Sequence, residues 1–94
     1  MPSPLTPDER SAMSASHPRW AIDGEQMSRT FEFGDFSEAL GFVVRLGIAA
    51  EQADHHPDID IRWNKVTVVL STHSAGALTD LDLGLATAAD SLDG

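Results

Sequence analysis

Apolar and polar residues alternate one by one in two regions of the chain, which is the pattern of strands with one buried face. In the first region, three apolar residues alternate with three polar ones: Met27, Phe31 and Phe33 with Ser28, Thr30 and Glu32. Asp23-Gly24 favours a hairpin turn before this region, so the residues from Trp20 onward are predicted to form a partner strand. The pattern returns on both sides of Asn64-Lys65, with apolar positions at Ile59, Ile61, Trp63, Val66, Val68 and Leu70. The sequence therefore predicts two β-hairpins.

Three other regions have the start signals or the spacing of helices. Residues 6–9 (TPDE) are typical of a helix start, and this helix should end before His17-Pro18. Asp35 and Glu38 form a capping-box pattern, after which apolar residues recur at helical spacing: Phe36, Ala39, Leu40, Val43, Val44, Gly47 and Ala50. This helix is expected to reach Gln52 or Ala53 and to stop before Pro57. Residues 79–82 (TDLD) open a last helix, whose predicted inner side carries Leu81, Leu85, Ala88 and Leu92.

The predicted order of elements is α-β-β-α-β-β-α. It indicates an α+β fold, in which a four-stranded antiparallel sheet has helices packed on one face. The other sheet face is expected to be solvated or used for self-association. A length of 94 residues fits one domain, and we expect residues 1–5 to be a flexible lead-in to a single domain over residues 6–94.

Composition narrows the classes of function. The net charge of -9, from 15 acidic and 6 basic residues, argues against binding to nucleic acid or to an anionic membrane. The chain has no cysteine, which excludes disulfides, thiolate catalysis and cysteine zinc sites. No apolar run approaches the roughly 20 residues that span a bilayer, and the N-terminus lacks the pattern of a signal peptide. We expect a cytoplasmic protein that handles a small molecule.

Three of the four histidines fall in two short segments, as His55-His56 and as His73. Imidazole moves protons in both directions near neutral pH, so grouped histidines indicate acid–base chemistry. Glu51 precedes His55 by four positions, and if the helix persists it can orient the imidazole or bind substrate. The start of the third strand and the end of the fourth lie at one end of an antiparallel sheet. The three histidines are therefore predicted to converge on one pocket.

Each candidate also has an ordinary structural interpretation. A single histidine at a strand end is more often a surface residue. Asp82 follows Thr79 by three positions, which is typical of a capping box. Trp63 would more often be a core residue, and Glu51 could be a solvated residue of the last helical turns. His17 has no companion, so no function is assigned to it.

The joint pattern carries more information than its parts. It consists of Glu51, three further positions, His55-His56-Pro57, an aromatic at Trp63, Thr72-His73, and Leu78-Thr79 followed by Asp82. This pattern resembles the pterin-4a-carbinolamine dehydratase family, and the likeness extends to the Trp20 strand, residues 31–36 (FEFGDF) and residues 39–42, and so over nearly the whole chain. Trp63 stands where many members have tyrosine. Ala77 and Ser74 depart from the family in the loop after His73, which affects the shape of that loop and not the histidines.

The resemblance implies a lyase that acts on 4a-hydroxytetrahydrobiopterin, or on another 4a-hydroxytetrahydropterin. Removal of water gives quinonoid dihydropterin, as in tetrahydrobiopterin recycling, and requires no metal and no cofactor. His55 and His73 are implied as the acid–base pair, and the roles of His55 and His56 could be exchanged. His56, Glu51, Trp63 and Thr72 are implied as substrate-binding residues, and Asp82 as a support for His73 or the loop.

The resemblance also implies partners. An aromatic amino acid hydroxylase would make the carbinolamine substrate, and the chain itself would form a homodimer or homotetramer.

Two other functions stay open. Three histidines and a carboxylate can bind zinc, although adjacent His55 and His56 would often point apart. The same fold could also serve without catalysis, as an assembly or dimerisation factor for a carboxylase or a transcription factor. Stoichiometric metal would support the first alternative, and a lack of pterin turnover the second.

Overall fold

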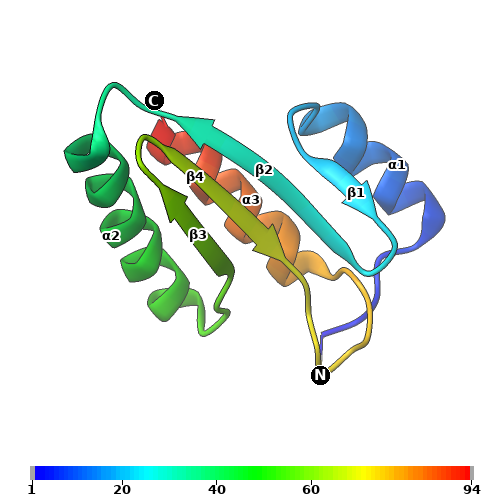
Figure 1. The fold of residues 1–94 in the computed structure, drawn as a ribbon. Coiled ribbons are helices and arrows are strands. Elements are labelled where there is room, and N and C mark those ends of the chain that lie inside the picture. The colour runs from blue at the N-terminus through cyan, green and yellow to red at the C-terminus, as the bar shows by residue number, and fades with distance from the viewer. Residues whose placement is uncertain (1, 94) are drawn as a thin grey trace.

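The computed structural model describes residues 2–93 and has the predicted order of elements (Figure 1). The helices are α1 (Pro7–Ser16), α2 (Phe36–Ala53) and α3 (Asp80–Asp93). The strands are β1 (Ala21–Asp23), β2 (Gln26–Glu32), β3 (Asp58–Arg62) and β4 (Lys65–Leu70). This is the α+β fold that the hydrophobic pattern predicts.

The four strands form one antiparallel sheet in the order β1-β2-β4-β3. Strand β2 pairs with β4 from Met27 opposite Leu70 to Glu32 opposite Lys65, so these two strands form the centre of the sheet. Figure 1 shows α2 and α3 lying along the sheet, with α1 beside the β1 edge. The start of β3 and the end of β4 lie at the same end of the sheet.

The core lies between the helices and one face of the sheet. Met27 and Phe31 of β2 are buried there, together with the alternate residues Val66, Val68 and Leu70 of β4. The ring of Phe31 packs on that of Phe42 from α2, with centroids 4.6 Å apart. The opposite sheet face is polar, and on it the hydroxyls of Thr30 and Thr67 are 2.9 Å apart.

The helix starts form as the sequence predicts. The Glu9 amide donates to Thr6 Oγ1 and the Thr6 amide donates to Glu9 Oε1, which completes a capping box at α1. At α2 the Glu38 amide donates to Asp35 Oδ1 at 2.8 Å. Residues of the predicted lead-in also have contacts, because the Leu5 amide donates to the Leu78 carbonyl at 2.8 Å. The flexibility expected for residues 1–5 stays a prediction.

The buried residues of α2 differ in part from the apolar residues that the sequence analysis placed at helical spacing. The structure buries Ala39, Phe42, Leu46 and Ala50, of which Phe42 and Leu46 were not in that set. Four apolar residues, three of which were in that set, are exposed instead: Phe36, Leu40, Val44 and Ile48. Apolar residues lie on most sides of this helix, so spacing alone does not define the buried side.

The second hairpin also turns one residue earlier than expected. Arg62 pairs with Lys65, so Trp63 and Asn64 form the turn, and Trp63 has a φ of 50°. The Asn64 side-chain amide donates to the Phe33 carbonyl, and the Phe33 amide donates to the Asn64 carbonyl, each at 2.9 Å. These two bonds hold the turn against the chain that leaves β2.

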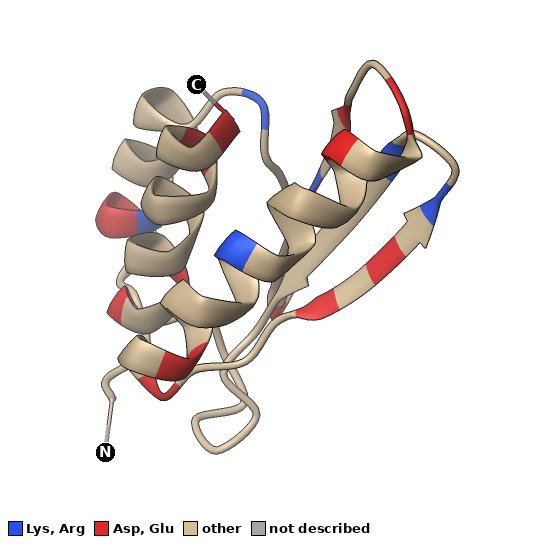
Figure 2. Ribbon diagram, turned by 90° about the vertical axis from the view of Figure 1, so that its left-hand side faces the viewer, with Lys and Arg blue, Asp and Glu red and all other residues tan. Residues whose placement is uncertain are grey.

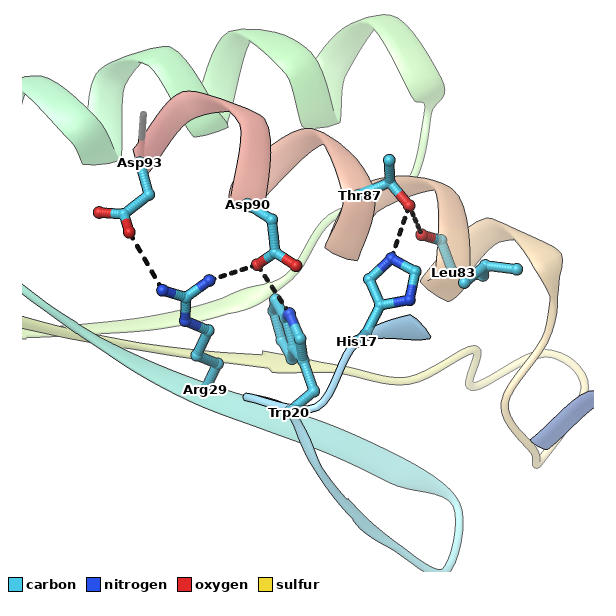
Figure 3. A network of polar contacts seen from close by, with 7 residues as sticks. All are labelled: His17, Trp20, Arg29, Leu83, Thr87, Asp90 and Asp93. Carbon is cyan, nitrogen blue, oxygen red and sulfur yellow. Dashed lines mark hydrogen bonds and ion pairs between the residues drawn. The ribbon is translucent and has the colours of Figure 1, made fainter. Parts of the chain in front are cut away.

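A polar network fastens the end of α3 to β2 (Figure 3). The Arg29 guanidinium donates to Asp90 Oδ1 at 2.6 Å and to Asp93 Oδ2 at 3.0 Å. The Trp20 indole donates to the same Asp90 oxygen at 2.9 Å. A surface hollow of about 440 Å³ lies over these groups and is lined by two arginines, Arg19 and Arg29, of which Arg29 is already paired with two carboxylates. We therefore assign the network a structural role.

Among the described residues, no helix has the length and apolar character needed to cross a membrane. In the view of Figure 2, acidic segments are spread over the helices and along a strand at the sheet edge, and basic segments are few. This distribution offers no basic patch on that face.

Candidate active site

The end of α2 places His55 and His56 on different sides of the chain. Asp54 follows the helix in the left-handed conformation, with φ of 50° and ψ of 43°. The His55 amide then donates to the Ala50 carbonyl at 3.1 Å, so the chain folds back over the last helical turn. As a result His55 is buried and His56 is exposed.

The His55 side chain bonds to Asp82 of α3. His55 Nε2 is 2.6 Å from Asp82 Oδ1, and the side chain of Asp82 is 0% exposed. The other carboxylate oxygen, Oδ2, accepts the Thr79 amide at 3.0 Å and the Thr72 hydroxyl at 2.8 Å. Asp82 thus joins the end of α2 to the loop between β4 and α3.

Hydrogen-bond chemistry fixes the orientation of this pair. An ionised carboxylate can only accept, so His55 Nε2 carries the hydrogen that points at Asp82. No described residue bonds the other ring nitrogen, Nδ1. Among the described residues, only Asn64 Oδ1 is a fully buried side-chain polar atom without a hydrogen-bond partner. Nδ1 of His55 is thus not fully buried. Nδ1 is therefore left without a partner among the described residues, in a side chain that is 10% exposed and lines a cavity.

Glu51 pairs with His56 and not with His55. The carboxylate Oε2 lies 3.0 Å from His56 Nε2, and the two side chains are 79% and 58% exposed. The sequence places Glu51 and His55 four residues apart, but α2 ends before His55. The turn at Asp54 consequently brings His56 to the glutamate.

His73 lies in the loop after β4 and is exposed. Its Nε2 is 3.4 Å from the Ser71 hydroxyl, which leaves the ring free to contact a ligand. His55, His56 and His73 together line one cavity of about 400 Å³, together with Pro2, Asp54, Ser71, Thr72, Ser74 and Leu81. The sheet register brings the three histidines to one place, as expected from the sequence.

The other predicted site residues lie in different positions. Trp63 is 70% exposed in the turn between β3 and β4, at the end of the hairpin away from the histidines, and does not line the cavity. Thr72 lines it, but its hydroxyl bonds to Asp82 and to Thr79. Asp82 bonds Thr72 and Thr79 of the loop, and its histidine partner is His55 and not His73.

Thr79, which the sequence analysis placed in a helix cap and in the family pattern without a role of its own, bonds to Thr72 and Asp82 behind the cavity. The cap is present, because Thr79 precedes α3 and its Oγ1 accepts the Leu81 amide at 3.2 Å. Asp82 completes the cap by accepting the Thr79 amide with one oxygen, while its other oxygen bonds His55. The capping interpretation of Asp82 is therefore correct, and the same carboxylate also bonds a histidine of the candidate site.

The described residues contain no group of three or more histidine, aspartate or glutamate side chains arranged to hold a metal ion. The carboxylates nearest the histidines each engage a single ring, Asp82 with His55 and Glu51 with His56.

Comparison with known proteins identifies the family. The family model of pterin 4 alpha carbinolamine dehydratase matches residues 3–92. The chain belongs to this family. A protein of Mycobacteroides abscessus is 48% identical over 92% of both chains, and one of Nocardia farcinica is 47% identical over 98% of both. Both carry the name "Putative pterin-4-alpha-carbinolamine dehydratase".

Solved structures of dehydratase-like proteins share the fold. The structure titled transcriptional coactivator/pterin dehydratase from Brucella melitensis has a TM-score of 0.91 and 35% identity, and the match covers 97% of this chain and 99% of that one. A pterin dehydratase-like protein, described as a RuBisCO assembly factor in the alpha-carboxysome, has a TM-score of 0.68 over 81% of this chain and 88% of that one. At 22% identity this second likeness shows the fold alone.

Proposed function

We propose that this dehydratase-family protein is an enzyme that removes water from 4a-hydroxytetrahydrobiopterin to give quinonoid dihydropterin. The observation that carries the proposal is the cavity lined by His55, His56 and His73, in a chain that belongs to the family. The reaction breaks the C4a–oxygen bond, so one proton must reach the departing hydroxyl and one must leave ring nitrogen N5. No electron is transferred, and imidazoles can handle both protons.

We assign His55 and His73 to these two proton transfers. His55 already directs its Nε2 hydrogen at Asp82, so its free Nδ1 is suited to accept the proton from N5. Asp82 then stabilises the imidazolium that forms, as a carboxylate behind a catalytic histidine does in other enzymes. His73 is exposed and weakly bonded, so it can donate to the 4a-hydroxyl. Each transfer is expected to contribute about 10²–10⁴-fold to the rate.

His56 and Glu51 bind and orient the pterin. His56 lines the cavity, whereas Glu51 does not line it and reaches it through its contact with His56. Both side chains are exposed, and each retains hydrogen-bonding capacity beyond their mutual contact. Because pterins are polar on one edge, such paired groups can fix which way the ring lies. The position of Trp63 at the far end of the hairpin favours a role for it outside the cavity of its own chain.

The activity is tested by the disappearance of the 4a-hydroxytetrahydropterin absorbance, measured with and without protein. The wild-type chain should accelerate the decay, and the His55→Ala, His73→Ala double variant should lose most of the acceleration. His17→Ala is the matched control, because His17 bonds Ser16 and Thr87 away from the cavity. This variant should retain the full rate. No acceleration by folded wild-type protein contradicts the proposal.

The natural partners follow from the same chemistry. An aromatic amino acid hydroxylase would supply the 4a-hydroxypterin, and the protein would act in the cytoplasm. We also propose a homodimer or homotetramer in which the exposed row on α2, formed by Phe36, Leu40, Val44 and Ile48, is covered.

A role as an assembly or dimerisation factor is the second candidate. The exposed row on α2 supports it, since such an apolar surface can receive another protein as well as a second copy. The absorbance measurement separates the two functions, because only the enzyme requires His55 and His73.

A further inference from the structure

A chain of hydrogen bonds behind His55 has only one possible direction. At one end the Leu81 amide donates to Thr79 Oγ1 at 3.2 Å. In the middle, the hydroxyls of Thr79 and Thr72 are 2.8 Å apart. At the other end the Thr72 hydroxyl donates to Asp82 Oδ2 at 2.8 Å. Because an amide only donates and a carboxylate only accepts, the Thr79 hydrogen must point to Thr72 and the Thr72 hydrogen to Asp82.

This chain is shielded from water. Thr79 and Asp82 are 0% exposed and Thr72 is 4% exposed. Hydrogen bonds in a low-dielectric interior are stronger than in water, and neighbouring bonds polarise one another. With two donors on Oδ2, the carboxylate of Asp82 is held in one orientation that directs Oδ1 at His55.

We propose that Thr72 and Thr79 are positioning residues for His55. Acting through Asp82, they keep the His55 hydrogen on Nε2 and leave Nδ1 open for a proton from the substrate. The catalytic consequence rests on the proposed function, whereas the positioning itself is a property of the folded protein. Thr72 thus acts behind the ring and not on the substrate, because its single hydroxyl hydrogen is already donated to Asp82.

The substitution Thr72→Val tests the proposal, because it removes the hydroxyl and retains the shape of the side chain. The fraction of neutral His55 with hydrogen on Nε2 should fall, measured by long-range ¹H–¹⁵N correlation NMR of the imidazole. The kcat for dehydration should fall about 10-fold, with little change in KM. This is the lower end of the loss of activity that follows when a hydrogen-bond partner behind a metal-bound histidine is removed. Thr72→Ser retains the hydroxyl and should restore both the tautomer and kcat.

Thr67→Val is the matched control. Thr67 also pairs with a second threonine, Thr30, at 2.9 Å, but on the exposed face of the sheet. This variant should have the wild-type tautomer and rate. If urea titrations show that Thr72→Val is unfolded without denaturant, Thr79→Val is used in its place. That substitution removes the hydroxyl that donates to Thr72 and keeps the backbone amide that donates to Asp82.

The outcomes separate this proposal from the proposed function. Equal tautomer fractions in Thr72→Val and Thr67→Val would overturn the positioning role, whatever the activity. If the wild-type protein does not turn over the pterin, the proposed function fails, and the NMR comparison still decides whether the threonines position His55.

Discussion

The substitution Asp82→Asn is expected to abolish most of the activity while leaving the fold in place. In the structure, Oδ2 of Asp82 accepts hydrogens from the Thr79 amide and the Thr72 hydroxyl. In the variant, the oxygen of the asparagine side chain must take that place, because an NH₂ group there would face two donors. The NH₂ group is then turned toward His55 Nε2. That nitrogen becomes an acceptor, and the ring hydrogen moves to Nδ1, where the free lone pair is needed.

The size of the effect follows from the known cost of comparable changes in other enzymes. A histidine held in the wrong tautomer by an aspartate-to-asparagine change costs about 10⁴-fold in serine proteases. Here His73 remains intact, and a single acid–base group is worth about 10²–10⁴-fold. We therefore expect kcat to fall by about 10²–10⁴-fold, which is a rise of about 3–5 kcal/mol in the activation free energy. The free energy of unfolding should fall by about 1–3 kcal/mol, because bonds to a charged acceptor become neutral ones.

Three measurements decide the outcome for Asp82→Asn. Initial rates of 4a-hydroxypterin decay give kcat, and urea unfolding shows that the variant is folded under the same conditions. The NMR tautomer of His55 should change from hydrogen on Nε2 to hydrogen on Nδ1. A folded Asp82→Asn protein with wild-type kcat would refute the reasoning that Asp82 sets the state of His55.

Three further predictions address other parts of the molecule. Arg29→Met removes the partner of Asp90 and Asp93, and should lower the free energy of unfolding in urea by about 1–3 kcal/mol. The kcat should be unchanged, because the network is away from the cavity. Unchanged stability would show that the network is not needed. Glu51→Gln should raise KM for the pterin more than it lowers kcat. It should change the free energy of unfolding by less than about 0.5 kcal/mol, because the pair with His56 is exposed. A KM equal to that of the wild-type protein would remove Glu51 from the binding site. Val44→Glu, at a position 56% exposed on α2, should lower the mass measured by light scattering, whereas an unchanged oligomer would place the interface elsewhere.

The fold follows from local sequence signals to a large extent. Alternation in β2 and β4 and the cap at Thr6 are short-range features, and each appears where the sequence predicts it. The first hairpin also forms, but Asp23 pairs with Gln26, so its turn residues are Gly24 and Glu25 instead of Asp23 and Gly24. The buried side of α2 could not be predicted in the same way. Its apolar residues surround the helix, so packing against the sheet, and not spacing, selects Phe42 and Leu46.

The meeting of the histidines was also predictable, because antiparallel pairing places the start of β3 beside the end of β4. The partner of each ring was not. Asp54 adopts a left-handed conformation that no strong local signal announces, and this single residue sends His55 inward and His56 toward Glu51. The link from His55 to Asp82 joins residues 27 positions apart, so it depends on the docking of α3.

The most direct measurement of the central claim is an NMR titration of the histidine rings with a stable dihydropterin that has the same ring system as the product. The chain has four histidines, three of which line the proposed site. The account predicts saturable shifts at His55, His56 and His73, and none at His17, which bonds Thr87 away from the cavity. An absence of shifts at saturating pterin, or shifts at His17 alone, would contradict the claim that these three rings surround the substrate.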